Sequence, residues 1–316
     1  MMHKNLVSLP GEWYVDNDQI YYMPKGDIED TTIEMQVRKE VLKINNVQNV
    51  VLENLKFISG NGVINSSKNI TINNCTMQYL SPFINAKGYS LGSNMHTGFC
   101  VNNCSGVEFI NSYVAHTWGT GISVVGGKHC SFKNCIIEDI GWVGTFTSSI
   151  YSSADNTLVE DCSFKDNGRF QICVDTDIKI DILHNSFRGA MQLGEDAGPL
   201  EFTSTQRVTP LDLKESVIAY NKIFDVHGIP AFEGHYQKQF IVAFYMEETN
   251  NYTAHHNLIY DITANSYNGP ENFVRAGQLM YLGPKFKHLD NPINFYNNTA
   301  FNYEGNIAIL NVCLIP

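Results

Sequence analysis

A short phrase recurs along this chain: an Asn or Asp, in several copies followed by Cys, then a short apolar run and a polar turn. Residues 134–141 (NCIIEDIG) give the fullest copy. The copies start at Asn54, Asn74, Asn111, Asn134, Asp161, Asn185, Asn221, Asn257 and Asn298. The shortest step, Asn54 to Asn74, is 20 residues, and the longest, Asn257 to Asn298, is 41 residues. Self-similarity at such a period predicts stacked structural repeats.

The segment before each Asn indicates the secondary structure of the repeat. It is short, rich in β-branched residues and close to alternating, which predicts a strand with one buried face. The clearest such segments are residues 70–72, 107–110, 158–160, 180–183 and 217–220. An Asn after a strand adopts turn conformations readily, and Asn side chains stacked coil on coil are expected to form a hydrogen-bonded ladder. Three strands per coil and a minimum period of ~20–25 residues predict an all-β, single-stranded right-handed parallel β-helix, with the longer steps as excursion loops on one side.

Because the repeat runs through most of the 316 residues, we expect one solenoid domain, residues 42–316. Residues 1–41 are expected to form N-terminal strands, joined by a turn at Asn17 and Asp18, and a connector or cap. Excursions are expected at residues 81–97, 203–215, 224–240 and 267–287. Long loops on one side of a rigid solenoid commonly build its binding groove. The apolar C-terminal end would expose strand edges, so we expect a truncated product or a homo-oligomeric contact there.

The net charge and the composition limit the kinds of partner that the protein is expected to bind. The net charge of −11 argues against nucleic acid and acidic membranes, which need basic surface. No apolar stretch approaches the ~20 residues that cross a bilayer, and no signal-peptide core is present, so the chain as given is expected to stay in the cytoplasm. Four of the eight cysteines lie at or near the repeat position, which favours buried stacked thiols over zinc ligands. These are Cys75, Cys104, Cys135 and Cys162.

The strand that follows the polar turn carries the residues of chemical interest. Alternation points Tyr151, Asp175, Tyr245 and Glu247 outward, while the register of residues 198–202 leaves the direction of Glu201 open. Outward acids and aromatic rings on one sheet suit a sugar, with the rings against sugar faces and the acids near hydroxyl groups.

Two stretches carry a resemblance to a known family. Residues 11–24 contain Gly-Glu-Trp-Tyr-x-Asp followed by Tyr-Tyr-x-Pro. Residues 196–261 present, in order, an Asp-x-Gly strand, an Ile-x-Tyr-Asn coil, a Tyr-x-acid-acid strand and a His-His-Asn coil. This order resembles the pectate-lyase-like, β-helical glycoside hydrolases that include α-fucosidases and xylanases. In those proteins the first stretch follows further N-terminal sequence, so the resemblance implies a shortened member, whose relatives are expected to be secreted or periplasmic.

The resemblance implies that Asp196 and Glu247 form a catalytic pair. The chain departs from the family pattern in having Glu rather than Asp at 247 and Pro-Leu-Glu at 199–201. Glycoside hydrolysis needs one protonated and one ionised carboxyl group, ~5 Å apart for retention or ~6.5–9.5 Å for inversion. The alternative interpretation makes Asp196 a turn cap and Glu247 a solvated acid.

Each of the remaining candidate residues could have a structural role instead of a functional one. We expect substrate contacts from the residues already noted together with two loop histidines and one Trp, each of which also fits a packed turn or a solvated surface. The expected substrate-binding residues are Glu201, Tyr245, His235, His227, Tyr151, Asp175 and Trp118. No metal or cofactor is expected for a hydrolase.

Two other functions stay open on this fold. A polysaccharide lyase acting on a uronate polymer would need a basic residue, for which Arg169, Arg188 and Arg207 are available, and calcium. A non-catalytic glycan-binding solenoid needs neither. Fold alone does not choose among the three.

Overall fold

The computed structural model describes residues 3–36, 38–80, 98–142, 146–204, 207–228, 238–264, 274–283, 291–304 and 308–309. Its contacts divide the chain into two compact units, Met1–Val37 and Arg38–Pro316. The first solenoid strand starts at Glu40, two residues before the start of the solenoid domain expected from the sequence.

The first unit is built on a hairpin. Strands β1 (Trp13–Asp16) and β2 (Gln19–Tyr22) pair antiparallel, after a single 3-10 turn, η1 (Lys4–Leu6). Asn17 and Asp18 join them with φ of 47° and 63°. Two consecutive left-handed residues of this type match the twist of a two-residue hairpin turn. The predicted hairpin and its turn are therefore confirmed.

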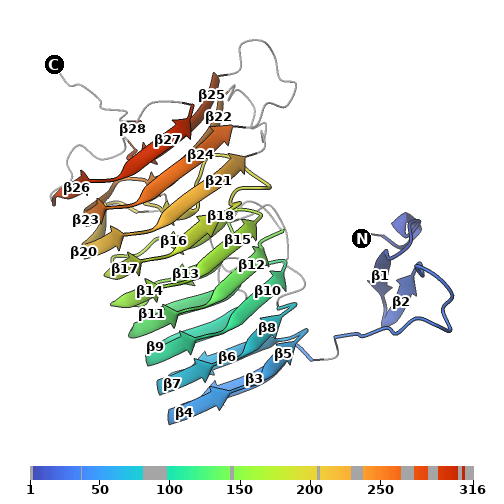
Figure 1. The fold of residues 1–316 in the computed structure, drawn as a ribbon. Helices are drawn as coiled ribbons and strands as arrows, with labels where there is room; N and C mark the ends of the chain where they lie inside the picture. The colour runs from blue at the N-terminus through green and yellow to red at the C-terminus, as the bar shows by residue number, and fades with distance from the viewer. Residues whose placement is uncertain are drawn as a thin grey trace. The chain divides into compact units, whose positions relative to one another are not determined.

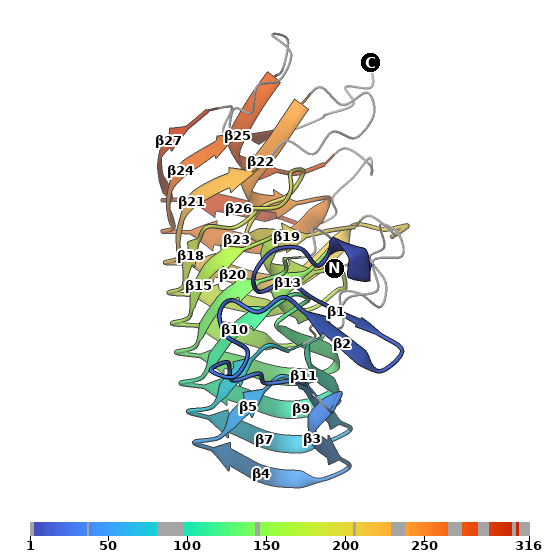
Figure 2. The ribbon, with the colours of Figure 1, turned by 90° about the vertical axis from the view of Figure 1, so that its right-hand side faces the viewer.

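The second unit is a stack of coils, each contributing one strand to each of three parallel ladders (Figures 1 and 2). Ladder 1 comprises β3 (Glu40–Asn45), β6 (Asn61–Asn65), the first parts of β9 (Phe99–Ile110) and β11 (Ile122–Lys133), β13 (Ser148–Ser152), β16 (Phe170–Val174), β19 (Leu200–Phe202), β22 (Lys238–Met246), β25 (Val274–Tyr281) and β28 (Ala308–Ile309).

Ladder 2 comprises β4 (Gln48–Glu53), β7 (Lys68–Asn73), the second parts of β9 and β11, β14 (Thr157–Glu160), β17 (Ile180–Leu183), β20 (Leu211–Ala219), β23 (Thr249–His255) and β26 (Ile293–Tyr296). Ladder 3 comprises β5 (Lys56–Ile58), β8 (Thr76–Gln78), β10 (Tyr113–Thr117), β12 (Ile136–Ile140), β15 (Ser163–Asn167), β18 (Ser186–Arg188), β21 (Lys222–Gly228), β24 (Leu258–Ala264) and β27 (Thr299–Tyr303). The predicted parallel β-helix is confirmed.

The recurring phrase forms the corner between ladders 2 and 3. In the early coils Asn74, Asn111 and Asn134 take the left-handed conformation there, with φ near 50°. In later coils His184 and Tyr220 take that conformation instead. The Asn of these later coils follows one residue further on and faces inward. The sequence repeats were predicted to match at their Asn residues. This match is wrong by one residue in the later part of the chain.

Two asparagine ladders result. An exposed one links Asn134 Nδ2 to Asn111 Oδ1 at 2.8 Å, among others. A buried one links Asn185 to Asn221 at 3.0 Å, Asn221 to Asn257 at 3.0 Å, and Asn257 to Asn298 at 2.9 Å. The predicted hydrogen-bonded ladder is confirmed in both places.

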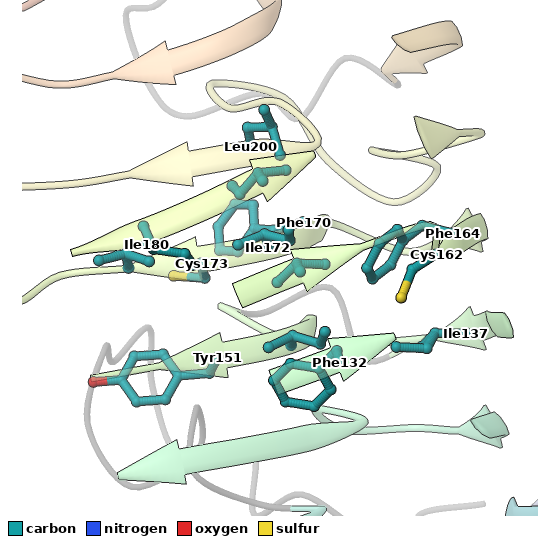
Figure 3. Close-up of a cluster of buried hydrophobic side chains, with 14 of the residues drawn as sticks. Phe132, Ile137, Tyr151, Cys162, Phe164, Phe170, Ile172, Cys173, Ile180 and Leu200 are labelled. Atoms are coloured by element: carbon teal, nitrogen blue, oxygen red, sulfur yellow. The ribbon is translucent and has the colours of Figure 1, made fainter. Parts of the chain in front are cut away.

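The core lies inside the three ladders and consists of side chains stacked from coil to coil (Figure 3). Phe109 stacks on Phe132 with ring centroids 5.1 Å apart, and Phe164 stacks on Phe187 at 4.8 Å. The thiols of Cys75, Cys104, Cys135 and Cys162 are free and buried, as predicted. Cys104, however, lies in the middle of β9, at the corner between ladders 1 and 2.

Parts of the expected excursions are regular strands. β25 lies within residues 267–287, β20 begins within residues 203–215, and residues 224–240 hold the end of β21 and the start of β22. The expected excursion at residues 81–97 lies outside the described residues, as does most of the C-terminal end.

Candidate functional site

One row of side chains on the outer side of ladder 1 carries the candidate chemistry. The residues paired across adjacent strands are Tyr151, Cys173, Glu201, Tyr245 and Tyr281. Their preceding neighbours face the core, so alternation turns the whole row outward. The direction of Glu201, left open by the sequence, is thereby resolved.

This outward row is nevertheless buried. Glu201 is 2% exposed, Tyr151 3% and Tyr245 7%. Around these strands both faces of ladder 1 are therefore covered, and the side chains on its outer face are shielded from solvent.

A close approach of two strands positions Asp196. Gly198 lies so near β22 that a Cβ there would be 2.2 Å from the carbonyl oxygen of Val242, so glycine is required. Pro199 O accepts hydrogen bonds from the backbone N–H groups of both Gln171 and Ile172, at 2.9 Å each. Asp196 stands just before this irregular segment with φ of 56°.

Asp196 and Glu247 lie on the same side of the solenoid. The Tyr245 hydroxyl donates to Asp196 Oδ1 over 3.4 Å. On the other side of the row, Thr203 Oγ1 donates to Glu247 Oε2 over 2.8 Å. The negative charges of Asp196 and Glu247 both act on Glu201, so three carboxyl groups gather around one tyrosine.

Glu201 has the most perturbed environment of the three. Burial raises the pKa of its carboxyl, the positive charge of Arg169 opposes that effect, and the charges of Asp196 and Glu247 raise the pKa further. The net effect holds the pKa of the Glu201 carboxyl well above its usual range and so favours its protonated form. Among the described residues, Glu201 Oε2 is buried and has no hydrogen-bond partner.

Arg169 is the buried cation beside this cluster. It is 3% exposed, and its guanidinium lies 4.8 Å from the Phe146 ring centroid and 4.9 Å from that of Phe170. Its Nη2 donates to the carbonyl oxygen of Glu195 over 3.3 Å. Arg169 is therefore held by packing and does not project toward solvent.

Tyr281 completes the row above Tyr245, with ring centroids 4.7 Å apart. Burial and the nearby charges of Glu247 and Asp196 raise the pKa of Tyr281 to about 12. Sequence reasoning missed Tyr281 because it falls in a segment that was expected to be an excursion. Only the register in which β25 pairs with β22 places Tyr281 next to Tyr245.

The other predicted residues are distributed over several coils. The Tyr151 hydroxyl donates to Asp175 Oδ1 over 2.8 Å, which joins two of the candidates one coil apart. Trp118 is 54% exposed in the turn before β11, three coils or about 14 Å along the ladder from Glu201. His227 lies on ladder 3, where it contacts Asp225 and Thr263. His235 lies outside the described residues.

A groove lies on a different face from the carboxyl cluster. It has a volume of about 630 Å³ on the outer side of ladder 3 and includes none of the three clustered carboxylates. Its lining residues are Ser163, Lys165, Ser186, Arg188, Phe224, Asp225, Tyr260 and Asp261. The acid with a raised pKa, Glu201, lies in the cluster and not in the groove.

Neither a metal centre nor a membrane span is found where the chain is described. No group of three or more His, Cys, Asp or Glu side chains in that part has metal-binding geometry. No helix in the same part is long and apolar enough to cross a membrane.

Comparisons with known proteins agree with this architecture. Residues 25–198 match the family model described as "Right handed beta helix region", which is more than half of the chain, so the protein belongs to this family. No curated protein sequence gives a match.

Among solved structures, the chain is similar to the crystal structure of PfbA, a surface adhesin of Streptococcus pneumoniae. The TM-score is 0.52 at 12% sequence identity, and the match covers 84% of this chain. The chain spans 62% of the adhesin. At this identity the similarity shows the fold alone.

Proposed function

We propose that the protein is a glycoside hydrolase whose proton donor is Glu201. The observation that carries this proposal is a buried carboxyl group with a raised pKa, whose Oε2 has no hydrogen-bond partner among the described residues. A buried polar atom left without a partner is costly. A glycosidic oxygen would supply the missing partner.

The second role belongs to a neighbouring carboxylate. Asp196 is exposed and accepts a hydrogen bond from Tyr245, so we assign it as the base or nucleophile. Glu247, whose negative charge raises the proton affinity of Glu201, favours the protonated form of the donor and accepts from Thr203. The proposal retains the two acids indicated by the family resemblance and adds the donor between them.

A lyase fits this site less well. The carboxylates of Asp196 and Glu247 repel a uronate polymer, and a lyase needs calcium or a basic side chain to neutralise the uronate carboxylate. Arg169, the cation whose charge acts on Glu201, is packed against two phenylalanine rings and donates to Glu195 O.

A non-catalytic glycan-binding protein is the second candidate. It is favoured by the similarity to PfbA, a protein described as a surface adhesin. The two candidates differ in one measurable property, because only a hydrolase releases reducing ends.

The test is a panel of polysaccharides with release of reducing sugar as the readout. Glu201→Gln and Asp196→Asn are each expected to lower turnover by about 10²-fold or more. Glu138→Gln, at a carboxylate on ladder 3 that is hydrogen-bonded to Tyr113 and Lys165, is the matched control and should leave turnover unchanged. Full turnover in Glu201→Gln would refute the assignment of the donor. Release of unsaturated uronate products would indicate a lyase instead.

A further inference from the structure

The groove on ladder 3 forms where a row of short side chains lies beside a row of long ones. Ser163 and Ser186 are paired across β15 and β18, and their short side chains leave space. The outward residues two positions further along these strands, Lys165 and Arg188, have long side chains that line the groove. The groove is therefore a property of the regular strands and needs no loop.

A row of aromatic rings continues from these cations along the solenoid. Phe224, Tyr260 and Phe301 are paired in register on β21, β24 and β27. The ring centroids are 5.1 Å apart between the first two and 5.0 Å apart between the last two. Lys222 Nζ lies 4.3 Å from the Phe224 ring centroid, over its face. Phe301 is 51% exposed, so the row offers apolar surface to a ligand over three coils.

Polar groups border this apolar row in a fixed arrangement. Arg188 Nε donates to Asp225 Oδ2 over 2.9 Å, and His227 Nε2 lies 2.7 Å from Asp225 Oδ1. Asn302 Nδ2 donates to Asp261. Within the described residues the Nη groups of Arg188 make no hydrogen bond, so they are available as donors beside two carboxylates and two serine hydroxyls.

The strand pairing and the charges around the groove exclude some classes of ligand and favour others. A peptide cannot add as a strand, because β15, β18, β21 and β24 already pair on both sides. An anionic polymer is disfavoured, because the cations Lys165 and Arg188 are balanced by Asp225 and Asp261. Alternating donors and acceptors beside ring carbons match the hydroxyl groups and C–H surface of a sugar.

We propose that the ladder 3 face binds a neutral oligosaccharide chain that lies along the solenoid axis, over Arg188 and the row Phe224, Tyr260 and Phe301 that continues from it. This site is separate from the carboxyl cluster on ladder 1. It does not require that the protein be a hydrolase.

The probe is an array of neutral and uronate-containing oligosaccharides of increasing length, followed by titration of the best ligand. Arg188→Ala and Tyr260→Leu are each expected to weaken binding about tenfold. Affinity is expected to increase with chain length until the ligand spans the aromatic row. Lys179→Ala and Tyr296→Leu are the matched controls, since they remove a partly exposed cation just before β17 and an exposed, stacked tyrosine on β26. Melting temperatures of all the variants show that they remain folded.

The outcomes separate this site from the proposed active site. Glu201→Gln should retain the full affinity of the ladder 3 site even if turnover is lost. The proposal is overturned if no neutral oligosaccharide binds, if only acidic ones bind, or if binding survives unchanged in both groove variants.

Discussion

At the scale of single residues, Glu201 shows what a sequence can and cannot reveal about this site. Its strand is only three residues long and follows Pro199, whose carbonyl accepts two adjacent N–H groups. Because of this irregularity, the alternation of inward and outward side chains does not continue evenly into the strand. The direction of the Glu201 side chain therefore could not be predicted. The raised pKa depends further on Asp196 and Glu247, which approach only in the folded stack.

The raised pKa of Glu201 has a consequence for stability. A carboxyl group that binds its proton more tightly in the folded state makes stability fall as pH rises from the unfolded value, about 4.3, toward the folded value. The slope approaches about 1.4 kcal/mol per pH unit for one proton. We expect Glu201→Gln, which cannot ionise, to lose less stability than the parent chain between pH 5 and pH 8. Urea unfolding across this range measures the difference, and identical slopes would contradict it.

At the scale of elements, strands were easier to predict than corners. The alternating segments before each Asn are strands, because one face of each must be buried. The corner position was misaligned because Asn serves two purposes here. It tolerates the left-handed conformation at Asn134, and it forms the buried amide ladder at Asn221. One residue type with two structural roles cannot be assigned from sequence alone.

The buried amide ladder should matter more for stability than the exposed one. Asn221 accepts from the backbone and side chain of Asn185 and donates to Ile182 O and to Asn257. Asn221→Ala leaves several of these buried groups unpaired, and we expect a loss of about 2–4 kcal/mol in the free energy of unfolding.

Asn65→Ala is the control, because Asn65 forms the same side-chain contact with Asn45 at 2.8 Å, in an exposed asparagine pair at the corner between ladders 1 and 2. Water can replace that bond, so the expected loss is less than about 1 kcal/mol. Denaturant titration of both variants gives the comparison, and equal losses would argue against a special role for the buried ladder.

At the scale of the whole molecule, the period of the repeat was enough to predict the fold, but not the site. A solenoid needs only that each coil resembles the next. The site needs particular residues in register, and Glu201 pairs with Tyr245 across 44 residues, whereas Tyr151 pairs with Cys173 across 22. Coil length varies that much because some coils carry excursions, so the neighbours of Glu201 could not be counted along the sequence.

The stack should also be unequally stable along its length. Strands β3, β4 and β5 pair on one side only within the described residues, and β4 is half exposed, while β13 and β16 are buried throughout. We expect backbone amides of β4 to exchange hydrogen at least about tenfold faster than those of β13, because end coils open at lower cost. Hydrogen exchange measured by mass spectrometry reports both segments, and equal protection would contradict this gradient.

The direction of the bonds between coils has a mechanical consequence. In each ladder the backbone hydrogen bonds join one coil to the next, so they run along the axis of the stack. A tensile load along that axis reaches the coils in series, and the weakest junction yields while the others stay closed. A load across the axis is shared in parallel by many bonds. The solenoid is thus compliant in one direction and stiff in the other, and its lengthwise strength is set by a single junction however many coils it contains.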